Sequence, residues 1–294
     1  MAATARTNLV SMLDLHTHST ASDGTFTPRE LIRLAKKIQL HALALCDHDT
    51  TFGIDEALAA ATNDNVQFIP GVELSAEHND TQVHIVGLYI DHRNPELQRA
   101  LTRTRHMRNL RNPLIIEKLQ EQGIDITMSE LEDLAGGDSI GRPLIAQLLI
   151  QKKVVSTANA AFDKYLNPGG IAYIPKERLR AVEAINVIRT AGGIPILAHP
   201  HQTRLSGTVL SQFVQSLTDA GLLGIEVFCS GYKTSMSAQL SQLAKKFGLV
   251  RSGGSDFHGA NKPRIRLGRG MGSLFVPNEL LPPIKALATK PEEA

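Results

Sequence analysis

Short apolar runs that alternate with helical patterns constrain the fold of this chain more than any other feature. We expect strands over residues 11–15, 42–46, 66–70, 83–90, 194–198, 223–228, 249–253 and 271–276. A helix should begin at Thr27 and Pro28, with Glu30 completing a capping box, and run to about Gln39. This alternation is typical of βα units around a largely parallel sheet, either open or closed as a barrel, and predicts an α/β fold.

Side chains that can bind metal ions follow these apolar runs. The blocks are Asp14 to His18, Ser22-Asp23-Gly24, Asp47-His48-Asp49, Gly71-Val72-Glu73, His84, His199-Pro200 and Gly254 to His258. In an extended strand residues i and i+2 face the same side, so His16 with His18, and Asp256 with His258, can each be directed at one point. We expect a metal site with more than one ion, assembled from many strand ends.

The donor types indicate hydrolytic chemistry. Imidazole and carboxylate ligands suit ions that activate water, and a carboxylate such as Glu73 can bridge two ions about 3.5–4 Å apart. Thiolates are absent from the blocks, which argues against a structural zinc finger. Cys46 and Cys229 lie within apolar runs, and we expect both to be buried and unpaired.

Length and composition set broad limits. The 294 residues, 42% hydrophobic and 20% charged, can bury the core of one large α/β domain with an insertion. A net charge of +2 gives no overall field that would attract a polyanion. The sequence shows no signal peptide and no apolar stretch long enough to span a membrane, so we expect a cytoplasmic protein without a membrane partner or an obligatory protein partner.

The strand pattern disappears in the middle of the chain. Helices are predicted over residues 95–122, with a kink at Pro113, from Thr127 onward, and over 143–151 and 157–166. We therefore predict a discontinuous barrel of residues 11–94 and 175–290, and a helical insertion of residues 95–174 that serves as a substrate lid.

In the order and identity of its ligand blocks, the chain resembles the PHP family, named for polymerase and histidinol phosphatase. The resemblance implies a distorted (β/α)7 barrel with two or three divalent ions, chiefly Mn²⁺, with Zn²⁺ or Fe²⁺ also used in the family. It implies one metal held by His16, His18, Glu73 and Asp256, a second held by Glu73, His84 and His199, and a third held by Asp23, His48 and His258. Some relatives have histidine at the position of Asp23.

Within this family, the insertion and its Gly141-Arg142-Pro143 motif are similar to one branch. That branch contains nucleoside 3′,5′-bisphosphate phosphatases and the 5′-to-3′ exoribonuclease RNase AM, which act on pAp-like nucleotides and on short 5′-phosphorylated RNA. Leu144 departs from the branch, where histidine would be expected. The resemblance implies a metal-dependent phosphoesterase with a nucleotide or short oligonucleotide substrate.

The residues themselves also indicate an anionic substrate. Arg142 and Arg204 are candidate substrate contacts, and five arginines between Arg99 and Arg111 form either a solvated helix face or part of a lid. Aromatic residues make up only 4% of the chain, which argues against a long groove for base stacking. Glu73 and Asp256 are the predicted catalytic carboxylates, and His201 is a candidate proton donor.

Three alternatives remain open at this point. A phosphatase for histidinol phosphate could use the same scaffold. Metal amidohydrolases, which cleave C–N bonds, also use His-x-His and a late aspartate, but they commonly place a lysine between two ions, and no lysine stands at a predicted strand end. A catalytically silent nucleotide-binding module would be expected to have lost ligands, whereas every ligand position here is filled.

Overall fold

The core of the fold is one β-sheet, and most of its strands are parallel. A computed structural model describes residues 12–62, 66–135, 141–175 and 178–288. Within these ranges the strand order is β1 (Leu13–Thr17), β2 (Ala42–Leu45), β3 (Gln67–His78), β4 (Thr81–Leu88), β6 (Ile194–Leu197), β7 (Gly224–Cys229) and β8 (Val250–Gly254), while β5 (Leu179–Arg180) pairs with β3. Strand β4 is antiparallel to both of its neighbours, β3 and β6, and the other pairs are parallel.

Backbone hydrogen bonds bring the two ends of the sheet together. The amide of His18 donates to the carbonyl of Phe257 at 3.0 Å, and the amide of Asp256 donates to the carbonyl of His16 at 2.9 Å. These bonds join β1 to the segment that follows β8, so the sheet is nearly closed as a barrel. The predicted α/β barrel is thus confirmed.

Closure depends on the absence of a side chain at Gly254. A Cβ atom built there would lie 2.4 Å from the backbone nitrogen of His16. We expect Gly254→Ala to lower the free energy of unfolding by about 1–3 kcal/mol, the usual cost of overpacking, and to displace His16. Denaturant unfolding and metal content would measure both effects, and a variant with wild-type stability would contradict this account of closure.

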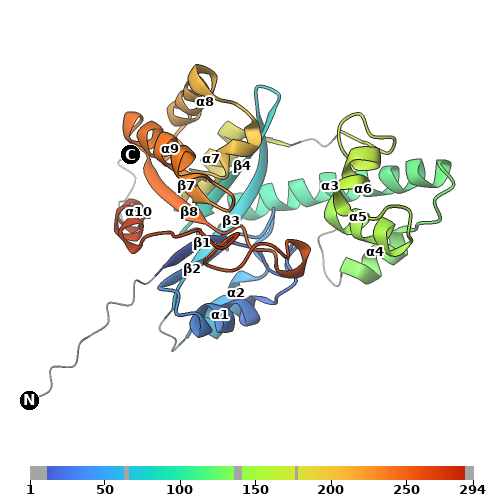
Figure 1. Cartoon of the computed structure of the whole chain (residues 1–294), viewed down its shortest axis with the longest axis horizontal. Coiled ribbons are helices and arrows are strands. Elements are labelled where there is room, and N and C mark those ends of the chain that lie inside the picture. The colour runs from blue at the N-terminus through green and yellow to red at the C-terminus, as the bar shows by residue number, and fades with distance from the viewer. Residues whose placement is uncertain (1–11, 63–65, 136–140, 176–177, 289–294) are drawn as a thin grey trace, which may run out of the picture.

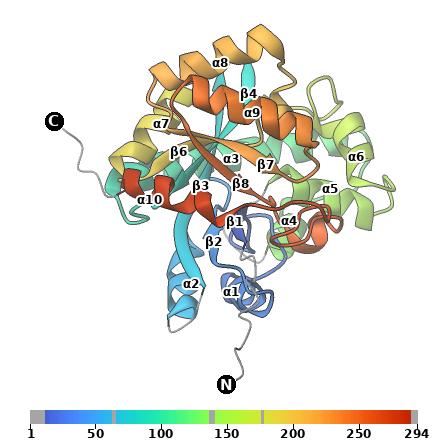
Figure 2. The same ribbon diagram turned by 60° about the vertical axis from the view of Figure 1, so that its left-hand side comes forward.

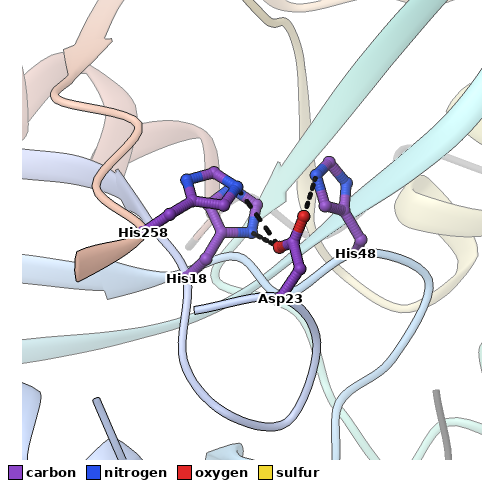
Figure 3. A group of neighbouring side chains, drawn as sticks. All are labelled: His18, Asp23, His48 and His258. Carbon is purple, nitrogen blue, oxygen red and sulfur yellow. Dashed lines mark ion pairs between the residues drawn. The ribbon is translucent and has the colours of Figure 1, made fainter. Parts of the chain in front are cut away.

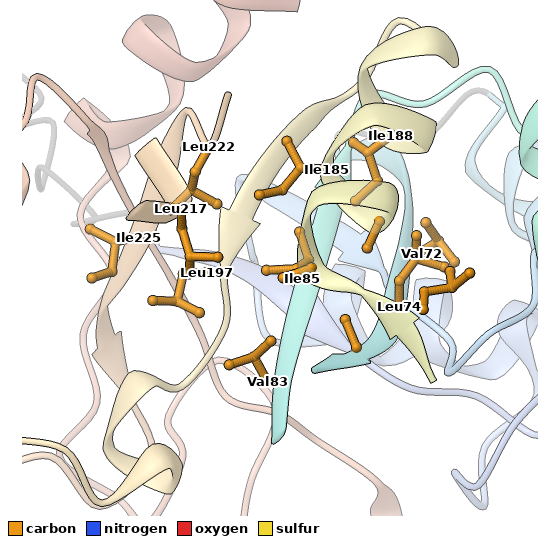
Figure 4. Close-up of a cluster of buried hydrophobic side chains, with 14 of the residues drawn as sticks. Val72, Leu74, Val83, Ile85, Ile185, Ile188, Leu197, Leu217, Leu222 and Ile225 are labelled. Atoms are coloured by element: carbon orange, nitrogen blue, oxygen red, sulfur yellow. The ribbon is translucent and has the colours of Figure 1, made fainter. Parts of the chain in front are cut away.

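Helices cover the outside of the barrel (Figures 1 and 2). They are α1 (Pro28–Lys37), α2 (Ile54–Ala61), α7 (Ala181–Thr190), α8 (Gly207–Asp219), α9 (Thr234–Lys246) and α10 (Leu281–Ala288). The predicted capping box at Thr27 and Glu30 is present at the start of α1. Figure 4 shows the largest apolar cluster, in which Val72 and Ile85 of the sheet pack with Ile188 of α7 and Leu217 of α8.

The middle of the chain forms a helical lobe beside the barrel (Figure 1). Its elements are α3 (Pro95–Glu121), α4 (Met128–Ala135), α5 (Arg142–Gln151), α6 (Ala158–Ala161) and a π-helix (Phe162–Leu166). The lobe has an apolar cluster of its own, which includes Ile115, Leu149 and Tyr165. Helix α3 continues past Pro113 as one element to Glu121.

The structure differs from the sequence prediction in three elements. Strand β3 extends to His78 instead of ending near residue 70, because it pairs along its length with β4 through a turn at Asn79 and Asp80, both with positive φ. Residues 271–276 form no strand, although the carbonyl of Val276 accepts from the amide of Leu13. The two-residue strand β5 was not predicted. Three short 3₁₀ helices, Pro200–Thr203, Gly259–Asn261 and Asn278–Leu280, lie in loops near the barrel ends.

Candidate metal centre

Glu73 lies at the centre of a group of histidines. Its side chain is fully buried, and its Oε1 atom lies 2.8 Å from His84 Nδ1 and 2.9 Å from His199 Nε2. Parallel strands bring their carboxyl ends to one edge of the barrel, whereas an antiparallel strand brings its amino end there. His84 therefore reaches the group from the amino-terminal half of β4, where it is paired in register with Ser75 of β3.

The second oxygen of Glu73 faces three more imidazoles. Its Oε2 atom lies 3.4 Å from His16 Nε2, 3.4 Å from His18 Nε2 and 2.8 Å from His48 Nδ1. His48 is held beside Glu73 because the amide of Asp49 donates to the Glu73 carbonyl and the amide of Glu73 donates to the Asp47 carbonyl. One carboxylate thus contacts five imidazoles from four different segments of the chain.

Asp256 borders the group on the side of β8. Its Oδ1 atom lies 3.3 Å from His18 Nε2, 3.4 Å from His258 Nδ1 and 3.9 Å from His16 Nε2. Its other oxygen, Oδ2, accepts from Lys262 Nζ at 2.7 Å. The two oxygens therefore have separate partners, and Oδ1 is directed at the imidazoles.

Asp23 forms the centre of a neighbouring set, which Figure 3 shows converging from three segments. Its Oδ1 atom lies 3.2 Å from His258 Nε2 and 3.8 Å from His18 Nδ1, and its Oδ2 atom lies 3.9 Å from His48 Nε2. His18 and His258 also stack, with ring centroids 4.0 Å apart. His18 and His48 therefore connect the Asp23 set to the Glu73 group.

The arrangement of donor atoms fits divalent cations. Among the described residues there are four sets of side chains whose donor atoms, within each set, all lie within 4.8 Å of one another. Each predicted ligand belongs to at least one set. The sets are His18, Asp23, His48 and His258; His16, Glu73 and His199; His16, His18 and Asp256; and His48, Glu73 and His84. In the described part of the chain, His16 Nε2, both nitrogens of His18 and Glu73 Oε2 are buried without a hydrogen-bond partner. Buried polar atoms that face one another in this way are stabilised by a cation between them.

The electrostatics of the group favour metal-ligating protonation states. Burial by itself would raise the pKa of Glu73, but His48 and His84 hold it well below its usual range. Burial and the neighbouring rings of His258 and His48 hold the pKa of His18 well below its usual value. The carboxylate is therefore ionised and the imidazole neutral, which are the forms that bind metal.

The pKa values of His16 and His48 are raised, in contrast to that of His18. Burial opposes their charged forms, but Glu226 and Glu73 raise the pKa of His16 well above its usual value, and Glu73 and Asp23 raise that of His48 to about 9. Without a cation these rings hold protons that balance the carboxylates. A bound metal would displace the protons, so metal binding should release protons.

Three other predicted site residues occupy different positions. Arg142 lines a cleft beside the cluster, whereas Arg204 is exposed and does not line that cleft. His201 is exposed, with its Nδ1 3.3 Å from the Tyr232 hydroxyl and its ring centroid 6.4 Å from that of His199.

Asp14, Asp47 and Asp49 of the ligand blocks accept hydrogen bonds from backbone amides, and Asp14 and Asp47 also accept from hydroxyl groups. Asp14 accepts from the amide and hydroxyl of Ser255, and Asp47 accepts from the amide and hydroxyl of Ser19. Asp49 accepts from the amide of Ser75. These bonds fix the loops that carry the ligands.

Glu226 and Lys262 were not identified from the sequence. Glu226 is almost fully buried in β7, and its Oε1 atom lies 2.8 Å from His16 Nδ1. An acid inside the apolar run 223–228 was the available signal, because a buried carboxylate requires a partner. Lys262 follows the last ligand block, and Asp256 holds its pKa above the usual value against the effect of burial. Lys262 is therefore a cation paired with Asp256.

Removing the Lys262 ammonium should leave the Asp256 side chain less well fixed in its ligand position. We expect Lys262→Met to weaken metal binding by about tenfold, the lower end of the range for groups that orient a metal ligand. Calorimetric titration with Mn²⁺ would measure the change. Lys262→Arg should restore part of the affinity, and unchanged affinity in Lys262→Met would show that Asp256 does not need this partner.

A cleft of about 210 Å³ opens between the metal centre and the helical lobe. Asp23, His48 and His84 line it together with residues of the lobe and of the segment after it; the full lining is Ser22, Asp23, His48, Ser75, Gln82, His84, Arg111, Asn112, Gly141, Arg142, Pro143, Phe162 and Arg178. Arg111 is thus the member of the arginine-rich helix that lines the cleft, while Arg99 and Arg103 pair with Glu96 and Glu183.

The arginines of the cleft are held by the lobe. Arg142 Nη1 donates to the Leu166 carbonyl at 2.9 Å, and its guanidinium lies 5.6 Å from the Phe162 ring centroid. Arg111 Nε donates to the Ile174 carbonyl at 2.7 Å. Burial and the charge of Arg178 lower the pKa of Arg142. A cleft lined by both imidazoles and guanidinium groups can bind an anion that carries more than one phosphate.

Two predictions outside the site can also be compared with the structure. Cys46 and Cys229 are both buried and free, as predicted. Over the described residues, no helix combines the length and the apolar character that crossing a membrane would require.

Comparisons with known proteins give a consistent result. The profile of the PHP domain family matches residues 14–167. A 5′-3′ exoribonuclease from Haemophilus influenzae is 38% identical, with 83% of this chain and 89% of the relative covered. The 5′-3′ exoribonuclease Rnm of Escherichia coli is 35% identical, with 90% of each chain covered. A 3′,5′-nucleoside bisphosphate phosphatase from Chromobacterium violaceum is 32% identical, with 92% and 93% covered.

Solved structures show the same likeness. A candidate metal-dependent phosphoesterase from Bifidobacterium adolescentis superposes with a TM-score of 0.85 at 31% identity, covering 95% of this chain and 97% of the other. A structure of an amidohydrolase from Chromobacterium violaceum, with bound sulfate and no metal, has a TM-score of 0.83 at 31% identity, covering 94% and 97%.

Proposed function

This chain belongs to the PHP domain family, and from that premise we propose that it is a metal-dependent phosphoesterase of nucleotides. Its substrates would be nucleoside 3′,5′-bisphosphates, short 5′-phosphorylated oligoribonucleotides degraded from the 5′ end, or both. The observation that carries this proposal is the cleft, which is lined by Asp23, His48 and His84 together with Arg111, Arg142 and Arg178. The relatives named as exoribonucleases and as a bisphosphate phosphatase support the same substrate class.

We propose that the clustered imidazoles and carboxylates hold two or three divalent ions. The residues are His16, His18, Asp23, His48, Glu73, His84, His199, Asp256 and His258. In the structure His18 also contacts Asp23, and His48 also contacts Glu73, so both can contribute to two sets. Bound ions would supply Lewis-acid activation of water and of the phosphoryl group. We propose Mn²⁺, which carboxylate oxygens suit, with Zn²⁺ and Fe²⁺, which imidazole nitrogens suit, as alternatives.

Side chains of the protein would perform the remaining tasks. Glu73 and Asp256 balance the positive charge at the centre of the site and fix the positions of the imidazoles. Guanidinium groups of the cleft would hold a phosphate that is not cleaved, so that the scissile phosphate lies against the imidazoles. His201 is the proposed proton donor to the leaving oxygen. Its Nδ1 faces Tyr232, so Nε2 is the atom that would carry this proton.

The helical lobe of residues 95–174 is proposed as a separate substrate lid on the barrel. From Ile115 onward its buried apolar residues form a cluster of their own, whereas Leu97 and Leu101 at the start of α3 pack in the barrel cluster. Arg111 and Arg142 connect the lobe to the cleft. The phosphate-binding side of the site would then belong to the lobe and the metal-binding side to the barrel.

A panel of metals and substrates tests the proposed function. Protein stripped with a chelator would be reloaded with Mn²⁺, Zn²⁺ or Fe²⁺ and assayed with pAp, AMP, histidinol phosphate and RNA pentamers with a 5′-phosphate or a 5′-hydroxyl. We expect activity only with metal, and the highest kcat/KM for pAp or the 5′-phosphorylated pentamer. Equal kcat/KM for the two pentamers would contradict a role for the 5′-phosphate. A preference for histidinol phosphate would establish the rival phosphatase.

C–N hydrolysis remains the second candidate because one structural neighbour is named an amidohydrolase. The pairing of Lys262 with Asp256 argues against it, since this lysine is engaged as a cation with one carboxylate and does not lie between two ion sites. Adding an N-acyl amino acid and a cyclic amide to the panel would test this alternative.

A further inference from the structure

Glu226 links two segments of the metal centre without belonging to any of the four donor sets. Its carboxylate is almost fully buried. Oε1 lies 2.8 Å from His16 Nδ1, and Oε2 accepts from the backbone amide of His199 at 2.6 Å. Both oxygens are therefore occupied, one by a side chain of β1 and the other by the backbone after β6.

The contact with His16 determines which nitrogen of that ring can bind metal. A carboxylate only accepts hydrogen bonds, so His16 Nδ1 must carry the hydrogen that faces Glu226. In a neutral imidazole the lone pair then lies on Nε2, the atom 3.4 Å from Glu73 Oε2 and without a hydrogen-bond partner in the described chain. Glu226 thus holds His16 in the ligating tautomer.

The contact with His199 holds an unfavourable backbone conformation. His199 has φ 27° and ψ 60°, in the left-handed region, and Pro200 follows it. Left-handed φ is costly for a residue with a side chain, and a following proline further disfavours helical conformations. The hydrogen bond from its amide to Glu226 stabilises this conformation, in which His199 Nε2 reaches Glu73 at 2.9 Å.

The strand geometry directs Glu226 to the site. Ile225 and Val227 belong to the apolar cluster beneath the outer helices, so Glu226 between them faces the other side of the sheet. The pairing of β7 with β8 also shifts register between Glu226 and Phe228. Irregularities of this kind re-aim a side chain and are common beside active sites.

We propose that Glu226 is a positioning residue that fixes two metal ligands at once, the tautomer of His16 and the backbone of His199. This inference rests on the proposed metal centre and goes beyond its ligand set. Removing the negative charge should loosen ligands on two separate segments of the chain. Metal affinity should therefore fall further than it would for a buried apolar residue of the same size.

Glu226→Gln gives a sharp test because glutamine has the same shape. Its single carbonyl oxygen can accept from only one of the two donors, and its NH₂ group would then face the other. If the oxygen remains on the His199 amide, the NH₂ group donates to His16 Nδ1 and moves the ring hydrogen to Nε2, which removes the lone pair that binds metal. We expect metal affinity to fall about 10- to 100-fold, as for other groups that orient a metal ligand.

The measurements are metal content per chain by mass spectrometry, calorimetric titration of the metal-free full chain with Mn²⁺ and Zn²⁺, and thermal unfolding without metal. Val227→Ala is the matched control, because it truncates a fully buried neighbour on the opposite face of β7. It should lower the unfolding temperature and leave metal affinity unchanged. Glu226→Gln should lower metal affinity and leave the unfolding temperature of the metal-free protein nearly unchanged.

The outcomes separate this inference from the proposed function. Unchanged affinity in Glu226→Gln, beside a wild-type protein that binds metal, would overturn the inference alone. A wild-type protein that binds no metal would overturn the proposed centre and this inference with it. If Glu226→Gln does not fold, the wild-type chain loaded with Zn²⁺ still provides a test. Its nuclear magnetic resonance spectrum should show a downfield, exchange-protected proton on Nδ1 of His16, and a proton on Nε2 would contradict the proposal.

Discussion

Replacing Glu73 with glutamine is expected to abolish metal binding and hydrolysis together. The neutral amide cannot balance the positive charge of the centre, and one of the two atoms replacing its carboxylate oxygens becomes a donor facing imidazole nitrogens. Metal ions contribute several kcal/mol of transition-state stabilisation in such sites. Their loss should therefore reduce kcat by roughly 10³-fold or more, since each 1.36 kcal/mol is about tenfold in rate.

Metal content, kcat and thermal unfolding would be measured on the same preparations. Metal at about 100 times its Kd should stabilise the wild-type protein by about 2.7 kcal/mol, and this increment should vanish in Glu73→Gln. Glu132→Gln, an exposed substitution in α4, is the control and should behave as wild type. A folded Glu73→Gln variant that retains its metal and its activity would refute the assignment of Glu73.

Replacing Arg142 with methionine is expected to impair recognition of the phosphate that is not cleaved. Methionine keeps much of the apolar stem beside Phe162 but removes the guanidinium that lines the cleft. A hydrogen bond to a charged group contributes about 1.5–3 kcal/mol, which corresponds to a KM for pAp or 5′-phosphorylated RNA on the order of 10- to 100-fold higher. Steady-state kinetics should show a smaller change for the 5′-hydroxyl pentamer.

Arg204→Met is the matched control for this variant. Both arginines are substrate contacts predicted from the sequence, but Arg204 is exposed and outside the lining of the cleft. We expect its KM for the same substrates to remain at the wild-type value. An increase in KM for Arg204→Met, with none for Arg142→Met, would place the phosphate on the other side of the metal centre, near His201.

Much of the site could be predicted because its signals are local. The alternation of strand residues indicates that His16 and His18 can act together, and a capping box marks the start of α1 within four residues. The identity and order of the ligand blocks were enough to indicate the family. Apolar runs with donor residues at their ends also predicted most strands of the barrel.

Other features depend on strand direction, which short windows of sequence do not contain. The antiparallel course of β4 explains why His84 joins the site from the amino-terminal half of a strand instead of from a strand's carboxyl end. The same pairing extends β3 well beyond its predicted end and places Glu73 inside the strand. The register of a hairpin is set by its turn and by both strands together.

The sequence alone therefore determined which residues could bind metal and which kind of fold would carry them, because periodicity and residue chemistry are local properties. Only the tertiary structure decided the contacts among them. Glu226 and His16 are 210 positions apart in the chain, and they meet only because the barrel closes. Packing of the lobe against the barrel likewise decided that Arg142 reaches the cleft and Arg204 does not. Such contacts arise from the closure and register of the whole sheet, and these depend on all of its strands together.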